Sequence, residues 1–283
     1  MKEKWLLIPL RVLSALLALL CPMGALAEGG AAPEGDISIV EFVELDENNR
    51  EIPVDPPSSD APEGEAGTAS AAKEAFIQDI IDLGEKLYIQ ADGHLQRAHY
   101  SGDIYVCKNF TVYLFRQNRD KYRMAAWPDV QLRIPNNLPA KKCKPYSYGY
   151  CWEDIPAEEG NPFEIAAQFL YDPSLSAEEN RELALDFMRQ VRRGDYFQMT
   201  AKYSHGTGAH SAIMISDYNP ETGTVHWMDS NMAGKRIGGI RYGKVQFNAE
   251  ESIDWWVDAF CQKTRGATLY RLRDDLIFAE DTP

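Results

Sequence analysis

A change in hydrophobic spacing near Gly194 is the feature that most constrains the fold of this 283-residue chain. Upstream of it, apolar residues recur at helical spacing, and Phe76, Ile80, Leu83 and Leu87 fall on one face of a helix. Downstream, apolar and polar residues alternate, which is typical of strands with one buried face. Helices followed by antiparallel strands predict an α+β domain.

Capping signals support the predicted helices. Ser176 and Glu179 have the spacing of a capping box, Arg192 and Arg193 suit a helix C-terminus, and Gly194 ends the segment. Helices are expected from Ala71 onward and over Tyr105–Asp120, Asn161–Asp172, Ser176–Arg193 and Glu251–Gln262. Strands are expected over Asp195–Tyr203, His210–Tyr218, Thr224–Asn231, Lys244–Asn248 and Ala267–Asp275.

The N-terminus has the pattern of a secretory signal peptide. Two lysines precede a short apolar run, Val12–Leu20, and alanines at positions 25 and 27 form a cleavage pattern. We therefore expect a signal peptide over 1–27, an exported protein, and no stable membrane span after cleavage.

Residues 28–70 differ in composition from the rest of the chain. They are rich in Pro, Gly, Ala, Ser and acidic residues, a composition that cannot bury enough apolar surface to fold, so we predict a disordered acidic tether. A single domain is then expected over 71–283, with an irregular, proline-rich insertion over 127–160. The formal net charge of -14 offers no basic field for phosphates, which argues against a nucleic-acid partner.

Export places the cysteines in an oxidising compartment. Cys143 and Cys151 bracket a tyrosine-rich segment, and the spacing allows either a disulfide or two free thiols. The sequence shows no zinc-ligand spacing and no glycine-rich phosphate loop, so we expect no cofactor. It leaves the oligomeric state open.

A predicted hairpin over Gly208–Asn231 places polar groups together at one end of two otherwise apolar strands. If its turn centres near Glu221, His210 lies opposite Asn231. Because side chains alternate along a strand, His210 then shares a face with Asp229 and Asn231. A one-residue slip would remove this arrangement.

An imidazole beside a carboxylate or an amide is the arrangement of a general base and its orienting group. Cys107 is the best candidate nucleophile, because the positive end of a helix dipole favours a thiolate at a helix start. A buried core cysteine is the alternative. His226 points to the opposite face on the predicted pairing, and His205 lies in a loop signal, so we expect neither to be the base.

The order and spacing of these pieces resemble the CHAP amidases and, more loosely, the NlpC-type cell-wall endopeptidases. The matching pieces are a cysteine that opens a helix, the pair Gly194-Asp195 at a strand entry, the His-opened segment "AHSAIMI", and the ending "DSN". The nucleophile context "YVCKNF" departs from the Asp-Cys-Ser-Gly of the NlpC-type enzymes, and the insertion after the helix is long.

The resemblance implies a papain-like fold and a bacterial enzyme that is secreted or attached to the cell envelope. Cys107 would be the nucleophile, His210 the general base, Asp229 the orienting group and Asn231 a further support, and backbone N–H groups at Cys107 and Lys108 would stabilise an oxyanion. The implied substrate is a peptide or amide bond in peptidoglycan. A non-catalytic secreted binding domain and a transglutaminase-like acyl transferase are the alternatives, and Asn231 remains an alternative orienting group.

Overall fold

The structure is a computed structural model that describes residues 70–92, 94–97, 104–138, 140–143, 145–146, 149–203, 206–232, 238–240 and 242–281. The predicted signal peptide, the predicted tether up to residue 69, and His205 lie outside the described residues. The helices are α1 (Ala71–Ala91), α2 (Cys107–Asn118), α3 (Ala140–Cys143), α4 (Ala177–Met188) and α5 (Ile253–Phe260), with 3-10 turns over Arg119–Lys121, Ala157–Glu159 and Ala279–Asp281. The strands are β1 (Gln96–Arg97), β2 (Tyr122–Met124), β3 (Phe163–Leu170), β4 (Tyr196–Tyr203), β5 (Gly206–Met214), β6 (Thr224–Met232), β7 (Tyr242–Ser252), β8 (Gly266–Leu272) and β9 (Leu276–Phe278).

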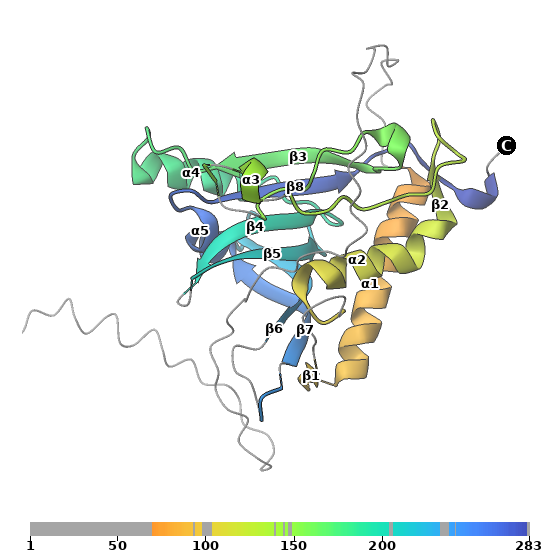
Figure 1. Ribbon diagram of the computed structural model, residues 1–283, viewed down its shortest axis with the longest axis horizontal. Coiled ribbons are helices and arrows are strands. Elements are labelled where there is room, and N and C mark those ends of the chain that lie inside the picture. The colour runs from red at the N-terminus through yellow and green to blue at the C-terminus, as the bar shows by residue number, and fades with distance from the viewer. Residues whose placement is uncertain are drawn as a thin grey trace, which may run out of the picture. The chain divides into compact units, whose positions relative to one another are not determined.

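Seven strands form one antiparallel sheet in the order β1-β7-β6-β5-β4-β8-β3, and β2 pairs with β9 separately. The helices flank this sheet (Figure 1). No helix among the described residues is long and apolar enough to cross a bilayer. The mixed architecture with an antiparallel sheet confirms the predicted α+β class.

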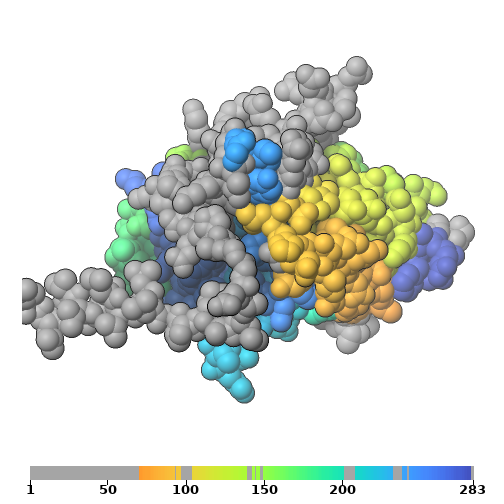
Figure 2. Space-filling model, turned by 90° about the horizontal axis from the view of Figure 1, so that it is seen from below, coloured from red at the N-terminus to blue at the C-terminus, as the bar shows by residue number. Residues whose placement is uncertain are grey.

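Two hydrophobic clusters pack on opposite faces of the sheet, because successive side chains of a strand point to opposite sides. The first joins α1 and α2, which lie side by side in Figures 1 and 2, to sheet residues that include Tyr196, Ile213, Met228 and Tyr270. The second joins α4 and α5 to the intervening residues, which include Phe197, Ala212, Met214 and Trp227. The domain therefore has helices on both faces of its central strands.

The predicted hairpin register is confirmed. Ile213 pairs with Met228 and Met214 with Trp227, as the predicted register requires, but among the described residues the pairing of these strands does not extend to His210 and Asn231. The helix that Cys107 opens is also confirmed, and its residues Phe110 and Leu114 are fully buried. Together these two elements determine where the predicted site residues lie.

One helix prediction was wrong, and another was wrong only at its C-terminal end. Residues Phe163–Leu170, within the segment predicted as a helix, form β3, which pairs with β8 at the sheet edge. Strand pairing overrides local preference here, as is common for short apolar segments. Helix α4 has the predicted capping box at Ser176 but ends at Met188, so Arg192 and Arg193 lie in the turn that follows rather than in the helix.

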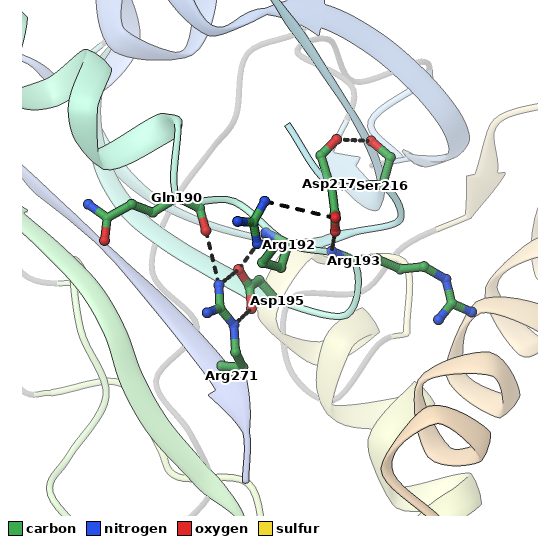
Figure 3. A network of polar contacts seen from close by, with 7 residues as sticks. All are labelled: Gln190, Arg192, Arg193, Asp195, Ser216, Asp217 and Arg271. Atoms are coloured by element: carbon green, nitrogen blue, oxygen red, sulfur yellow. Dashed lines mark hydrogen bonds and ion pairs between the residues drawn. The ribbon is translucent and has the colours of Figure 1, made fainter. Parts of the chain in front are cut away.

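The Gly194-Asp195 pair has a structural role in this turn. Gly194 has a φ of +89°, and a Cβ there would lie 2.6 Å from Ile77 Cδ1, so only glycine fits without strain. Asp195 is completely buried and accepts two bonds from the Arg271 guanidinium, from Nε at 2.8 Å and from Nη2 at 2.7 Å (Figure 3). The backbone N–H of Arg192 donates to the same carboxylate at 2.8 Å. The pair thus joins the start of β4 to β8 and to the preceding turn.

Residues 149–152 of the predicted insertion lie against the sheet, held by polar contacts. The Gln198 amide donates to the carbonyl of Gly149, Thr268 Oγ1 donates to that of Tyr150 at 2.8 Å, and the N–H of Trp152 donates to Tyr270 Oη at 2.6 Å. Cys143 and Cys151 are buried free thiols, so the structure contains the second of the two predicted alternatives. Burial raises the pKa of both, that of Cys151 to about 11.

Candidate active site

Cys107 is the first residue of α2, and its side chain is half-buried. Val106 precedes it in an extended conformation and provides no side-chain cap. The first N–H groups of a helix lack partners within the helix, so this helix start keeps backbone donors available next to the thiol. The thiol lies against β5, with Cys107 Sγ 3.9 Å from the carbonyl oxygen of Ala209, the residue before His210.

The His210 ring is bonded to Asp229 across β5 and β6. The distance from His210 Nε2 to Asp229 Oδ2 is 2.8 Å, and both side chains are 2% exposed. An ionised carboxylate only accepts hydrogen bonds, so Nε2 carries the proton in this bond. The other ring nitrogen, Nδ1, is buried and has no conventional hydrogen-bond partner among the described residues. It is the nitrogen left to exchange a proton.

The environment of His210 favours the charged ring. Burial lowers the pKa of the imidazole, but the bond and negative charge of Asp229, together with Cys107, outweigh burial and raise that pKa to about 9. The thiol lies close to this strand position, since Cys107 Sγ is 3.9 Å from the carbonyl oxygen of the residue that precedes His210. An imidazole that stays protonated at neutral pH stabilises a thiolate beside it.

Asp229 is surrounded by hydrogen-bond donors. Besides His210, Oδ2 accepts from Asn231 Nδ2 at 3.2 Å and from Trp227 Nε1 at 3.3 Å. The other oxygen, Oδ1, accepts from Gln246 Nε2 at 3.1 Å. Asp229 therefore contacts the imidazole directly, and Asn231 supports the carboxylate from the next position on the same face of β6. Of the two predicted candidates for the orienting group, Asp229 is the one that contacts the ring, and Asn231 contacts Asp229.

Lys108 is a neighbour that sequence reasoning considered only for its backbone N–H. Its side chain is buried, Nζ donates to the carbonyl oxygen of Pro135 at 2.8 Å, and Nζ lies 3.9 Å from the centre of the Trp152 ring. Burial holds the pKa of this amine well below its usual range. The contacts tie the insertion to the first turn of α2.

Sequence reasoning also missed Gln246, because only the strand register shows which residue of β7 faces Asp229. The alternation on β6 already placed Trp227 on the face of Asp229, but not as a donor to its carboxylate. His226 Nδ1 contacts Asn248 Oδ1 at 2.8 Å, away from the carboxylate that His210 contacts. The described part of the chain contains no cluster of His, Cys, Asp and Glu residues that could hold a metal ion.

A cavity of about 360 Å³ lies elsewhere, and none of the four predicted site residues lines it. Its walls include Lys73, Glu74, Arg193 and Arg271. These side chains bond to one another or to neighbouring carboxylates, as in the pairs Lys73–Asp274 at 2.7 Å and Arg193–Glu74 at 3.1 Å. The cavity therefore belongs to the ion-pair network around Asp195 and not to the chemistry around Cys107.

Comparison of the chain with protein-family models, with curated proteins and with solved structures gives no significant match. Interpretation of the site therefore depends on the residues themselves and on their geometry.

Proposed function

We propose that this chain is an exported cysteine amidohydrolase or endopeptidase with a papain-like catalytic domain, which hydrolyses peptide or amide bonds in peptidoglycan. The observation that supports it most is that three elements carry the three groups such an enzyme needs. Helix α2 provides a half-buried thiol, β5 a buried imidazole and β6 a buried carboxylate. The helix that Cys107 opens packs against these two strands, which is the layout expected of a papain-like domain. The predicted export and the CHAP-like motifs support the substrate class.

Each group has a role that its position permits. In the resting pair His210 Nδ1 already holds the thiol proton, and the Cys107 thiolate attacks the carbonyl carbon of the substrate. The N–H groups of the first turn of α2 stabilise the oxyanion that forms. The imidazolium, stabilised by Asp229, returns the proton to the leaving amine as the C–N bond breaks, and a thioester remains on Cys107.

Hydrolysis completes the cycle. His210 Nδ1 accepts a proton from water as the water oxygen attacks the thioester carbonyl. The C–S bond then breaks, the carboxylic acid leaves, and the thiolate is restored beside the imidazolium. The same thioester could transfer its acyl group to an amine instead of to water, so added amines distinguish acyl transfer from hydrolysis.

Thiol reactivity provides the first test. Iodoacetamide near pH 7, with the labelled peptides mapped by mass spectrometry, should modify Cys107 faster than Cys143, Cys151 and Cys261. The variant His210→Ala should slow the labelling of Cys107 about 100-fold, the lower range for loss of an acid–base partner. The matched control His94→Ala, which removes an exposed imidazole outside the sheet, should leave the rate unchanged.

Zymography on purified cell walls tests the substrate. The wild-type protein should lyse the wall material, and Cys107→Ala should not. Lysis that survives Cys107→Ala would falsify the proposal. Binding to walls without lysis would point instead to a binding domain, and incorporation of added amines would indicate acyl transfer.

A further inference from the structure

The ladder between β6 and β7 changes register next to Asp229. Trp227 on β6 pairs with Ala249 on β7, and Asp229 pairs with Gln246. The step between these two pairs is two residues along β6 but three residues along β7. One extra residue on β7 therefore opposes this part of β6, which is the definition of a β-bulge.

The bulge decides which side chain faces the carboxylate. If the register of Trp227 and Ala249 continued without a shift, Phe247 would lie opposite Asp229. A phenyl ring donates no hydrogen bond, and one oxygen of a buried carboxylate would lose its donor at a substantial cost. With the shift, Gln246 faces Asp229 instead, and its amide reaches Oδ1 at 3.1 Å.

Asn248 provides the backbone conformation that the bulge needs. Its φ is +52°, in the left-handed region, where asparagine is one of the few residues other than glycine that are found regularly. Its side chain is held by His226, with 2.8 Å between Oδ1 and Nδ1. The His226 ring in turn lies 3.6 Å from Glu250 Oε1. The bulge is therefore fixed by contacts on the face of the sheet opposite to Asp229.

We propose that Gln246 is a positioning residue for the Asp229–His210 pair and that the bulge at Asn248 places it there. The inference rests on the proposed function of Cys107 and His210. The three other donors, His210 included, converge on Oδ2. Gln246 alone holds Oδ1 among the described residues, so it fixes the rotation of the carboxylate that keeps Oδ2 aimed at the ring.

Removal of the amide tests the positioning role. Gln246→Leu should slow the alkylation of Cys107 about tenfold, which corresponds to one hydrogen bond to a charged group. Gln131→Leu is the matched control, because Gln131 also donates to a carboxylate, at 2.6 Å to Asp120, but on the surface. The control should leave the rate unchanged.

A pH series separates positioning from a general structural effect. Gln246→Glu keeps the shape of the side chain, and its introduced carboxyl can donate a hydrogen bond only when protonated. The ratio of its alkylation rate to that of the wild type should therefore be lowest at pH 8 and rise at least threefold towards pH 5. A loss that is uniform across the pH range would contradict the positioning role.

The contribution of the bulge is tested at Asn248. Asn248→Gly retains access to a positive φ and should keep the rate within about twofold of the wild type. Asn248→Val penalises that conformation and should cause a loss similar to that of Gln246→Leu. Equal rates for the two Asn248 variants would rule out the bulge as the device that places Gln246.

An NMR titration of the His210 ring distinguishes failure of this inference from failure of the proposed function, because it does not require Cys107 to react. Gln246→Leu should move the midpoint below that of the wild type, and Gln131→Leu should not. If the His210 midpoint moves in Gln246→Leu but the Cys107 thiol is inert, the positioning role stands and the proposed enzymatic function is refuted. A reactive thiol with neither the rate nor the midpoint changed in Gln246→Leu would refute the positioning role.

Discussion

Asp195, which directly precedes β4, and Asp229 on β6 are both buried carboxylates, but they have different kinds of partner. Asp195 accepts two bonds from the guanidinium of Arg271, a group that stays charged at any physiological pH (Figure 3). Asp229 contacts an imidazole, a group that can gain and lose a proton. The Asp195–Arg271 pair can stabilise the fold but cannot exchange a proton. The Asp229–His210 pair can stabilise the fold and can also exchange a proton.

The electrostatic surroundings of the two carboxylates differ as well. Burial raises the pKa of Asp195, and the bonds and charge of Arg271 offset only part of this effect. The main partners of Asp195 come from β8 and the turn before β4, far along the chain from Cys107. At Asp229 the donors come from β5, β6 and β7, and the half-buried Cys107 thiol lies 3.9 Å from the carbonyl oxygen of the residue before His210. Burial of an acid alone therefore does not mark a carboxylate as a candidate for proton exchange, whereas a titratable partner does.

The largest expected effect comes from breaking the Asp195 pair. Arg271→Leu leaves a completely buried carboxylate without its cation and should lower the free energy of unfolding by about 3 to 5 kcal/mol, as measured by urea denaturation at pH 7. Because a carboxylate without its cation binds a proton more readily, the deficit should shrink as the pH falls towards 4. The alkylation rate of Cys107 in the folded fraction should not change.

The control for this variant is Arg181→Leu. Arg181 also bridges two carboxylates, Asp254 and Asp258, each at 2.5 Å, but on the surface. Its loss should change stability by no more than about 1 kcal/mol. If Arg271→Leu and Arg181→Leu lowered the free energy of unfolding equally, burial of Asp195 would not explain the contribution of its ion pair to stability.

The next effect should appear only at Asp229, as a dependence of stability on pH. The pKa of His210 is raised to about 9, above the ordinary value near 6.5, so the folded protein holds this proton more tightly than the unfolded chain does. The stabilisation is then fully present below about pH 6.5 and is lost as the pH rises through about 9. The stability advantage of the wild type over His210→Gln should therefore shrink by about 3 kcal/mol between pH 6 and pH 10.

The Asp195 pair provides the contrast in that experiment. The guanidinium of Arg271 keeps its proton throughout this range, so the difference between the wild type and Arg271→Leu should stay constant between pH 6 and pH 10. A constant difference for His210→Gln as well would mean that the ring is neutral in the folded protein, and the proposed imidazolium would be wrong.

The two regions also differ in how much of them the sequence predicts. The hairpin register follows from local turn chemistry and alternation, so the proximity of His210 and Asp229 could be predicted from residues 208–231 alone. The role of Gly194-Asp195 could not, because its partners Ile77 and Arg271 are distant in sequence. Gln246 was missed for a similar reason, since a single residue in a left-handed conformation shifts the register of β7.

The errors in secondary structure have related causes. The segment that forms β3 contains residues acceptable in a helix, and only its pairing with β8, about 100 residues away, makes it a strand. Helix α4 ends at Met188 because the following residues turn towards Asp195, whose carboxylate takes the N–H of Arg192. The first contact joins distant segments and the second lies within one turn, but each overrides the helical pattern of the sequence.

The smallest expected effect separates backbone strain from side-chain collision at the Asp195 turn. Gly194 and Gly223 both have a positive φ, +89° and +70°, but only at Gly194 would a Cβ meet a neighbour, Ile77, at 2.6 Å. Gly223→Ala should therefore cost about 1 kcal/mol, for the conformation alone. Gly194→Ala should cost about 2 to 3 kcal/mol, because the collision with a packed core residue is added to the same strain. Urea denaturation of the two variants measures both values. If Gly194→Ala instead lowered the reactivity of Cys107 at unchanged stability, the glycine-aspartate pair would belong to the reactive region, and the distinction between the two carboxylates would have to be abandoned.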